Sequence, residues 1–290
     1  MLIGGLQKLT LVDYPGKVAA TVFTCGCNFR CPFCHNPELV IPQEISRQPK
    51  ISPEEVLGFL RERVGQLDGV CVTGGEPTIQ DDLPDFIAKI KELGFLVKLD
   101  ANGSRPAMLE RLLVGGLLDY VAMDIKAPLD SLKQANGYHG FRACPTIPVM
   151  ARNGAERNDE AISANIDVDC RVAPLRCAPR DDEDEGHGYD KLAGVAVDLD
   201  KIRKSVKMIM NSGVDYEFRT TVIKNFHAEK DLLSIAESLR RAKKYFLQPF
   251  SYRGKVVGAE FRGATSLSSE ELRQIAEKCE QFVQKCEVRD

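Results

Sequence analysis

Short apolar runs alternate with amphipathic segments along most of this 290-residue chain. Strands are predicted at 17–24, 69–75, 95–103, 118–128, 214–224 and 244–250. Helices are predicted at 51–64, 81–94, 106–116, 198–213, 229–242 and 266–286. Strands that alternate with helices predict an α/β fold with a parallel sheet and right-handed crossovers. Six such units predict a partial (β/α)6 barrel, because a closed barrel of eight units needs two more than the sequence contains.

Two of the predicted helices carry clear start signals. Ser52 with Glu55, and Ser268 with Glu271, form plausible capping boxes, in which the serine and the glutamate each bond the other's backbone. Pro53 fits the first helical position, where no backbone N–H is needed.

The alternation fails between residues 130 and 196. This segment is rich in Pro, Asn, Asp and Gly and contains an acidic run at 181–185, which favours an irregular, acidic surface insertion after the fourth strand. We therefore predict one partial-barrel domain made of residues 1–129 and 197–290, interrupted by the insertion.

Composition excludes several classes of protein. The net charge of −3 does not favour a nucleic-acid binder, and no apolar run approaches the roughly 20 residues of a membrane span. The first residues lack the pattern of a signal peptide, so a cytoplasmic location is expected.

Four cysteines lie within ten residues of the segment TCGCNFRCPFCHN, 24–36. Ten cysteines in a reducing compartment favour metal ligation over disulfides. Cys27, Cys31 and Cys34 are spaced as C-x3-C-x2-C, whereas a zinc site would need a fourth ligand that only Cys25 or His35 could supply locally. An iron–sulfur cluster held by three cysteines would leave one iron open to another ligand.

This spacing after a first strand resembles the signature of the radical S-adenosylmethionine (SAM) superfamily. The resemblance implies that Cys27, Cys31 and Cys34 bind a catalytic [4Fe–4S] cluster, whose fourth iron chelates SAM. Phe33 matches the aromatic residue that such proteins usually place before the last cysteine. Cys25 is expected to be a bystander.

Two later motifs agree with this resemblance. The sequence GGEP contains Gly74, Gly75 and Glu76, and in the superfamily this motif cradles the amino group of SAM. The sequence LDANG contains Asp100 and Asn102, whose side chains could bond ribose hydroxyls. Taken alone, the first would be an ordinary turn and the second an Asx turn.

Further candidates end the later strands. Asp124 and Lys126 are two apart and share one face of a strand, either as a structural ion pair or near the SAM site. Arg219 could bind a carboxylate in a bidentate manner, and Gln248 is a candidate for contact with SAM or substrate.

The flanking sequences DYPGK and CHNPEL resemble activating proteins of anaerobic ribonucleoside-triphosphate reductase. That resemblance implies reductive cleavage of SAM, a 5′-deoxyadenosyl radical and a glycyl radical made on a partner enzyme. It also implies an external electron donor such as flavodoxin or ferredoxin.

Three alternatives remain open from the sequence: an activase of a pyruvate formate-lyase-type enzyme, a radical SAM enzyme acting on a small molecule, and a zinc-binding interaction module. Cys144, Cys170 and Cys177 in the insertion could hold a second metal, although widely spaced thiols are more often ordinary cysteines.

Overall fold

The computed structural model describes residues 1–129 and 188–289, and these belong to one compact α/β unit. Its sheet contains β1 (Ile3–Thr10), β2 (Ala19–Thr24), β3 (Gly69–Gly74), β4 (Leu96–Ala101), β5 (Tyr120–Asp124), β6 (Asp215–Val222), β7 (Tyr245–Pro249) and β8 (Cys286–Val288). The strands lie in sequence order, β1 is antiparallel to β2, and each later neighbour is parallel. β1 and β8 form the two edges, so the sheet stays open.

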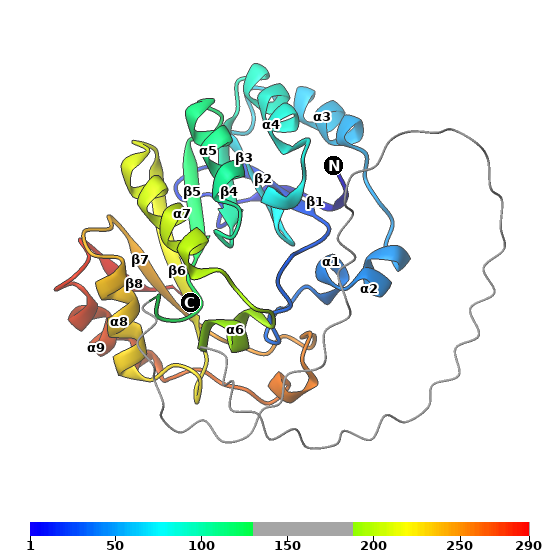
Figure 1. Cartoon of the computed structure of the whole chain (residues 1–290). Helices are drawn as coiled ribbons and strands as arrows, with labels where there is room; N and C mark the ends of the chain where they lie inside the picture. Colours follow the sequence, from blue (N-terminus) through cyan, green and yellow to red (C-terminus); the bar gives the residue numbers. More distant parts are fainter. Residues whose placement is uncertain (130–187, 290) are drawn as a thin grey trace, which may run out of the picture. The chain divides into compact units, whose positions relative to one another are not determined.

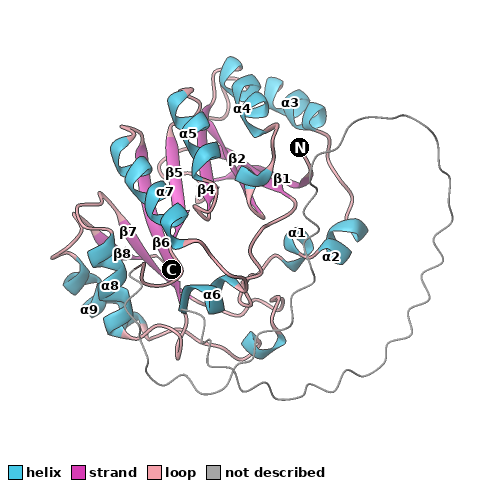
Figure 2. Ribbon diagram, in the orientation of Figure 1, coloured by secondary structure: helices cyan, strands magenta, loops and turns pink. Residues whose placement is uncertain are grey.

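The predicted fold class is confirmed. Strands β2 to β7 fall inside the six predicted ranges, while β1 and β8 extend the sheet at its edges. The helices are α1 (Pro37–Val40), α2 (Pro42–Arg47), α3 (Pro53–Arg61), α4 (Leu83–Glu92), α5 (Pro106–Val114), α6 (Gly188–Ala193), α7 (Leu199–Asn211), α8 (Glu229–Ser238) and α9 (Ser269–Cys279). Two short 3-10 helices are η1 (Pro77–Ile79) and η2 (Ala259–Phe261). Helices α3, α4, α5, α7, α8 and α9 lie along the outer side of the strands (Figures 1 and 2).

Local sequence explains where α3 and α9 begin. The Ser52 hydroxyl accepts from the Glu55 N–H at 3.1 Å, and the Glu55 carboxylate accepts from the Ser52 N–H at 2.8 Å. Ser268 and Glu271 make the same two bonds, at 3.2 and 2.8 Å. Both predicted capping boxes are therefore confirmed.

Two segments differ from the sequence prediction. Residues 188–193, expected to be irregular, form helix α6, because Tyr189, Leu192 and Ala193 are buried against the core. The helix predicted over 266–286 spans only Ser269–Cys279, and its end continues instead as strand β8. The rest of the predicted insertion, together with Cys144, Cys170 and Cys177, lies outside the described residues.

The two faces of the sheet have different chemistry. The main apolar core lies between the outer face and the helices, whereas the inner face carries polar and charged side chains. These inner residues are Thr21, Thr73, Lys98, Asp100, Asp124, Glu217 and Arg219. Among the residues described, no helix has the combination of length and apolarity needed to cross a bilayer.

Candidate functional site

The cysteine loop, residues 25–36, leaves the C-terminal end of β2. Cys31 is buried, while Cys27 and Cys34 are half-buried. Local bonds shape the loop: the Cys34 N–H donates to the Cys31 carbonyl at 3.0 Å, and the Phe29 N–H donates to the Cys27 sulfur at 3.3 Å. The loop therefore gathers three thiols from one short stretch of chain.

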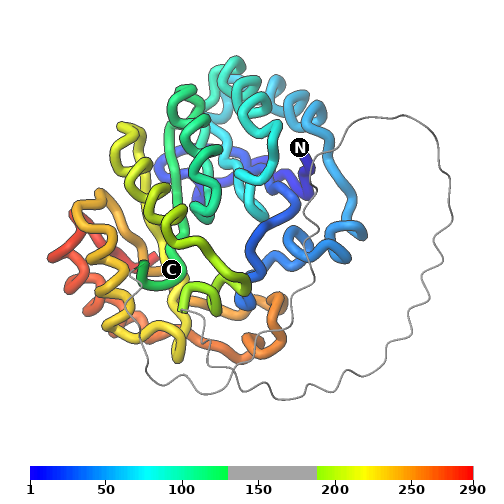
Figure 3. Tube along the Cα trace, viewed as in Figure 1, coloured from blue at the N-terminus to red at the C-terminus, as the bar shows by residue number. Residues whose placement is uncertain are grey.

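Helix α6 supports the cysteine loop from the second half of the chain (Figure 3). The Arg30 N–H donates to the Ala193 carbonyl at 2.8 Å. Gly194 has φ +68, and any side chain there would collide with the Arg30 carbonyl. Only glycine fits this close backbone contact at positive φ.

The segment after β7 supports the other end of the loop. The Val257 N–H donates to the Cys34 carbonyl at 3.1 Å, and the Gly258 N–H donates to the Pro32 carbonyl at 2.7 Å. The loop is thus fixed by backbone bonds to elements far away in sequence.

Burial makes the three thiols weak acids in the absence of a metal. It raises the pKa of Cys27 to about 12 and that of Cys31 to about 11, and it also raises the pKa of Cys34. The positive charge of Lys126 opposes the rise at all three. Binding of iron would therefore displace protons from these thiols, with Lys126 favouring the thiolates.

Cys25 faces another part of the protein. It is buried, and a side chain at Gly4 would collide with its sulfur and with Leu39. The thiol therefore packs against β1 and α1, in keeping with the bystander role that the sequence predicts.

The two glycines that end β3 bring that strand against the cysteine loop. Gly74 has φ +114, and a side chain there would collide with Thr24. A side chain at Gly75 would collide with the Gly26 carbonyl, which accepts from the Glu76 N–H at 2.8 Å. These two glycines therefore allow β3 to approach the protein's own backbone closely.

Glu76 is almost completely buried and ties β3 to β4. Its carboxylate accepts from the Thr78 N–H at 3.1 Å, from the Thr78 hydroxyl, and from the Asn102 N–H at 2.6 Å. Burial raises the pKa of Glu76 to about 7, although the bonds from Thr78 and Asn102 oppose this rise.

The amide of Asn102 also has partners within the protein. Its nitrogen donates to the Asn28 side-chain oxygen at 3.0 Å, and its oxygen accepts from the Ser104 hydroxyl at 2.6 Å and from the Ser104 N–H at 3.0 Å. The Asx-type bond to Ser104 agrees with the turn interpretation, while the bond to Asn28 ties the end of β4 to the cysteine loop.

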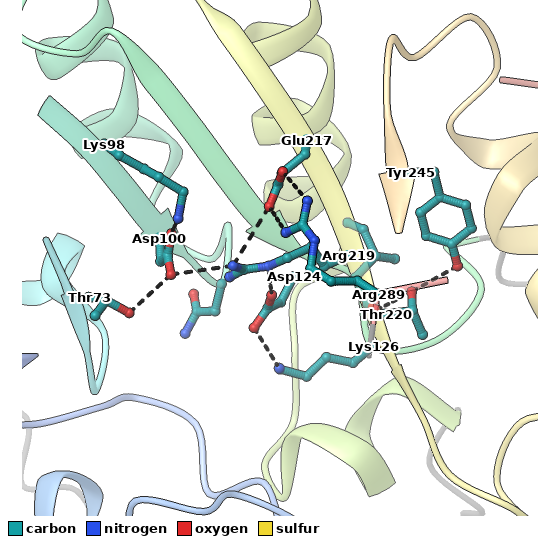
Figure 4. A network of polar contacts seen from close by, with 12 residues as sticks. Thr73, Lys98, Asp100, Asp124, Lys126, Glu217, Arg219, Thr220, Tyr245 and Arg289 are labelled. Carbon is teal, nitrogen blue, oxygen red and sulfur yellow. Dashed lines mark hydrogen bonds and ion pairs between the residues drawn. The ribbon is translucent and has the colours of Figure 1, made fainter. Parts of the chain in front are cut away.

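Asp100 lies in a charge network on the inner face of the sheet (Figure 4). It accepts from Lys98, from the Thr73 hydroxyl at 3.2 Å and from Arg219 at 3.4 Å. Burial alone would raise its pKa, but Arg219 and Lys98 outweigh burial and hold the pKa below its usual value. Asp100 is therefore an ionised carboxylate that already has cationic partners.

Arg219 links that carboxylate to the end of β5. Its Nε donates to Asp124 at 3.0 Å, and Asp124 in turn lies 3.8 Å from the Lys126 ammonium (Figure 4). The Lys126 nitrogen also lies 5.5 Å from the centre of the Phe33 ring. Asp124 and Lys126 thus form an ion pair, and Lys126 also contacts Phe33 of the cysteine loop.

A second part of the network involves a residue that the sequence did not indicate. Arg289 follows β8 and holds Glu217 with two bonds, of 2.6 and 2.8 Å. Glu217 also accepts from the Tyr120 hydroxyl at 2.8 Å and lies 3.9 Å from Arg219. No local motif marks Arg289, because its position depends on an edge strand of three residues.

Phe33 and Gln248 differ in their surroundings. Phe33 is buried and packs near the Phe261 ring, with 6.2 Å between ring centres. Gln248 is half-buried at the end of β7, and its side chain makes no hydrogen bond to the described part of the chain. Gln248 is therefore free to contact a ligand, whereas Phe33 has a packing role.

The donor set fits an iron–sulfur cluster. Within residues 1–129 and 188–289, no three His, Cys, Asp or Glu side chains form a site for a single metal ion. A [4Fe–4S] cluster is instead held by thiolates, and the cysteine loop supplies three of them while Cys25 packs elsewhere. The buried hydroxyl of Tyr189 lies beside the backbone of Lys126, the residue whose charge favours the three thiolates.

Comparison with known proteins agrees with this donor set. A family model described as the radical SAM superfamily matches residues 21–143, which include the cysteine loop. Residues 21–143 therefore carry a radical SAM domain. Radical SAM proteins use a [4Fe–4S] cluster and SAM as cofactors, so this radical SAM protein is expected to use both.

Full-length similarity extends to one group within the superfamily. A protein of Methanocaldococcus jannaschii, provisionally named a glycyl-radical enzyme activating enzyme, is 26% identical over 99% of this chain and 95% of its own length. A pyruvate formate-lyase-activating enzyme of Clostridium pasteurianum is 32% identical over 43% of this chain and 52% of its own.

Structural similarity supports the fold alone. The crystal structure of Streptococcus suis SuiB superposes with a TM-score of 0.57 at 12% identity, covering 93% of this chain. The present chain spans about half, 48%, of SuiB.

Proposed function

We propose that this radical SAM enzyme generates a glycyl radical on a partner enzyme, and that the partner is an anaerobic ribonucleoside-triphosphate reductase. The observation that carries the proposal is the cysteine loop held against the Gly-Gly-Glu end of β3, in a chain that aligns over almost its whole length with a relative named for this activity. The DYPGK and CHNPEL flanks favour the reductase as partner.

In this proposal Cys27, Cys31 and Cys34 are the cluster ligands. Two observations support them: they share one loop that is fixed at both ends, and Lys126 lowers the cost of ionising all three thiols. Held by these three residues, the cluster would supply the electron for reductive cleavage of SAM, the chemistry that hydrogen abstraction from a glycine α-carbon requires.

The residues that would contact SAM differ in how many hydrogen bonds they already make within the protein. The side chain of Gln248 makes no hydrogen bond to residues 1–129 or 188–289, and Gln248 is proposed to contact SAM or substrate directly. Glu76 is held by Thr78 and Asn102, so it would offer the SAM amino group a carboxylate that is already oriented.

We propose that the charged side chains on the inner face of the sheet hold the residues beside the cluster in place. Asp100 and Arg219 are held by partners on their own and neighbouring strands, so we propose that they position Asp124 and Lys126 beside the cluster. Asp100 accepts three bonds, from Lys98, Thr73 and Arg219, so its carboxylate keeps acceptor capacity for a ribose hydroxyl.

The open sheet is compatible with a protein substrate. β1 and β8 are not joined, so a glycine-bearing loop of a partner has an unclosed side through which to approach. A buried, water-poor interior would protect a reactive radical from quenching. The cytoplasmic location expected from the sequence is part of the same proposal.

A second candidate partner is a pyruvate formate-lyase-type enzyme. It is favoured by the partial similarity to the Clostridium pasteurianum activating enzyme. The two candidates require the same chemistry and differ only in the protein that docks.

The partner is tested by electron paramagnetic resonance. The enzyme, reconstituted with iron and sulfide and reduced without oxygen, is incubated with SAM and with either candidate partner. We expect a glycyl doublet with the reductase and none with the lyase. A doublet with the lyase alone would support the second candidate, and deoxyadenosine without any doublet would point to a different substrate.

A further inference from the structure

The segment after β7 forms an exposed basic turn, defined here as residues 251–258. Its sequence, SYRGKVVG, contains Arg253 and Lys255 and no acidic residue. Gly254 has φ +90, and the Tyr252 hydroxyl donates to the Gly254 carbonyl at 2.8 Å. This tight turn requires glycine and leaves both cationic side chains exposed.

The base of this turn is bonded directly to the cysteine loop. The Val257 N–H donates to the carbonyl of Cys34, a proposed cluster ligand, at 3.1 Å, and Gly258 makes a similar bond to Pro32 at 2.7 Å. The turn is thus one hydrogen bond away from a cysteine that would bind iron.

A second connection joins the start of the turn to the same loop. The His35 Nε2 lies 2.8 Å from the Ser251 carbonyl. The His35 ring also stacks on Phe250, with 5.0 Å between ring centres and 21° between planes. The two ends of the basic turn are therefore both fixed to the residues around Cys34, so its position relative to the thiols is well defined.

The charges at the tip are exposed in the part of the chain that the structure describes. Neither Arg253 nor Lys255 forms an ion pair within residues 1–129 and 188–289. The chain as a whole carries a net charge of −3, so a turn with two cations and no acidic residue departs locally from the overall charge. Such a patch attracts an acidic protein at long range and orients it.

We propose that the basic turn is the docking surface for an acidic one-electron donor protein that reduces the cluster, an inference that rests on the proposed function. Cys27, Cys31 and Cys34 would hold the cluster that accepts the electron, and the donor would be oxidised by one electron, with no bond made or broken and no proton needed. A docked donor has to approach only the rim of the cysteine loop. The protein substrate has the different task of delivering its glycine to the interior, beside SAM.

Direct binding tests this surface. The variant R253E/K255E reverses both charges, and K89E/K207E is the control, since Lys89 on α4 and Lys207 on α7 are exposed and make no ion pair with the described residues. Calorimetric titration with an oxidised acidic flavodoxin at low ionic strength should show about a tenfold weaker affinity for R253E/K255E and little change for the control. Equal affinities of the two variants, or no binding to the wild type, would overturn the proposal.

A rate comparison separates this inference from the proposed function. Formation of 5′-deoxyadenosine is followed with reduced flavodoxin and, separately, with photoreduced deazaflavin, which needs no docking surface. R253E/K255E should be slower by about tenfold with flavodoxin only. Equal slowing with both reductants would show that the turn serves another step, and wild type that makes no deoxyadenosine with deazaflavin would refute the proposed function itself.

Discussion

Replacing Cys27, Cys31 or Cys34 by alanine is expected to abolish both stoichiometric iron binding and formation of 5′-deoxyadenosine. Each thiol belongs to one loop that is fixed by backbone bonds at both ends, and the fourth cysteine of that loop, Cys25, lies against β1. Loss of one ligand leaves two thiolates, which is too few for a cluster with a single open iron. The measurements are iron and acid-labile sulfide per chain, and deoxyadenosine by chromatography after anaerobic reduction.

The matched control is Cys25→Ala in the same loop. Because this thiol packs against Gly4 and Leu39, its loss should leave iron content and deoxyadenosine unchanged. The expected cost is only the packing of a small buried group, about 1 kcal/mol of unfolding free energy. Loss of iron in this variant, to the same extent as in Cys34→Ala, would contradict the assignment of three ligands.

The second large effect is expected from Glu217→Ala, which removes the carboxylate that joins Arg289, Tyr120 and Arg219. Breaking a buried ion pair on one side typically costs about 3–5 kcal/mol. Arg289 is about one third exposed and can turn toward water, which favours the lower end of that range. Urea unfolding of the wild type and the variant, monitored by circular dichroism, gives the difference directly.

Glu237→Ala provides the comparison for this effect. Glu237 pairs with Arg240 on the surface of α8 at 3.3 Å, and both side chains are more than half exposed. Exposed pairs of this kind contribute about 0–1 kcal/mol. If the two variants lose similar stability, the inner network does not have the role described here.

Much of the fold could be predicted because its strands and helices are marked by local sequence signals. The apolar runs located β2 to β7, and the Ser52 and Ser268 capping boxes located the starts of α3 and α9. The edge strands escaped detection for physical reasons. β1 contains two glycines and lacks a regular alternation, and β8 has only three residues, too few for any periodicity.

The sequence indicated which residues belong to the candidate site better than it indicated which residues they contact. The predicted positions from the cysteine loop to Arg219 do lie along one side of the sheet, because parallel strands end at the same edge. Asp100 is a candidate for a ribose contact, and the structure adds that Lys98 forms an ion pair with it. That ion pair could have been anticipated, since residues two apart in a strand share a face.

Other contacts had no local signal. Arg289 reaches Glu217 from 72 residues away along the chain, through a strand that the sequence does not indicate. Helix α6 follows a stretch of sequence without hydrophobic periodicity. The sequence therefore did not indicate that Tyr189 is buried beside Lys126. Such long-range pairings depend on the assembled sheet rather than on neighbouring residues.

The most direct test of the central claim follows one hydrogen atom. The partner reductase is produced with glycine deuterated at the α-carbon and incubated without oxygen with SAM and the reduced activase. The account predicts 5′-deoxyadenosine carrying one deuterium, detected by mass spectrometry, in step with the glycyl radical. Deoxyadenosine free of deuterium, or none at all, would contradict it.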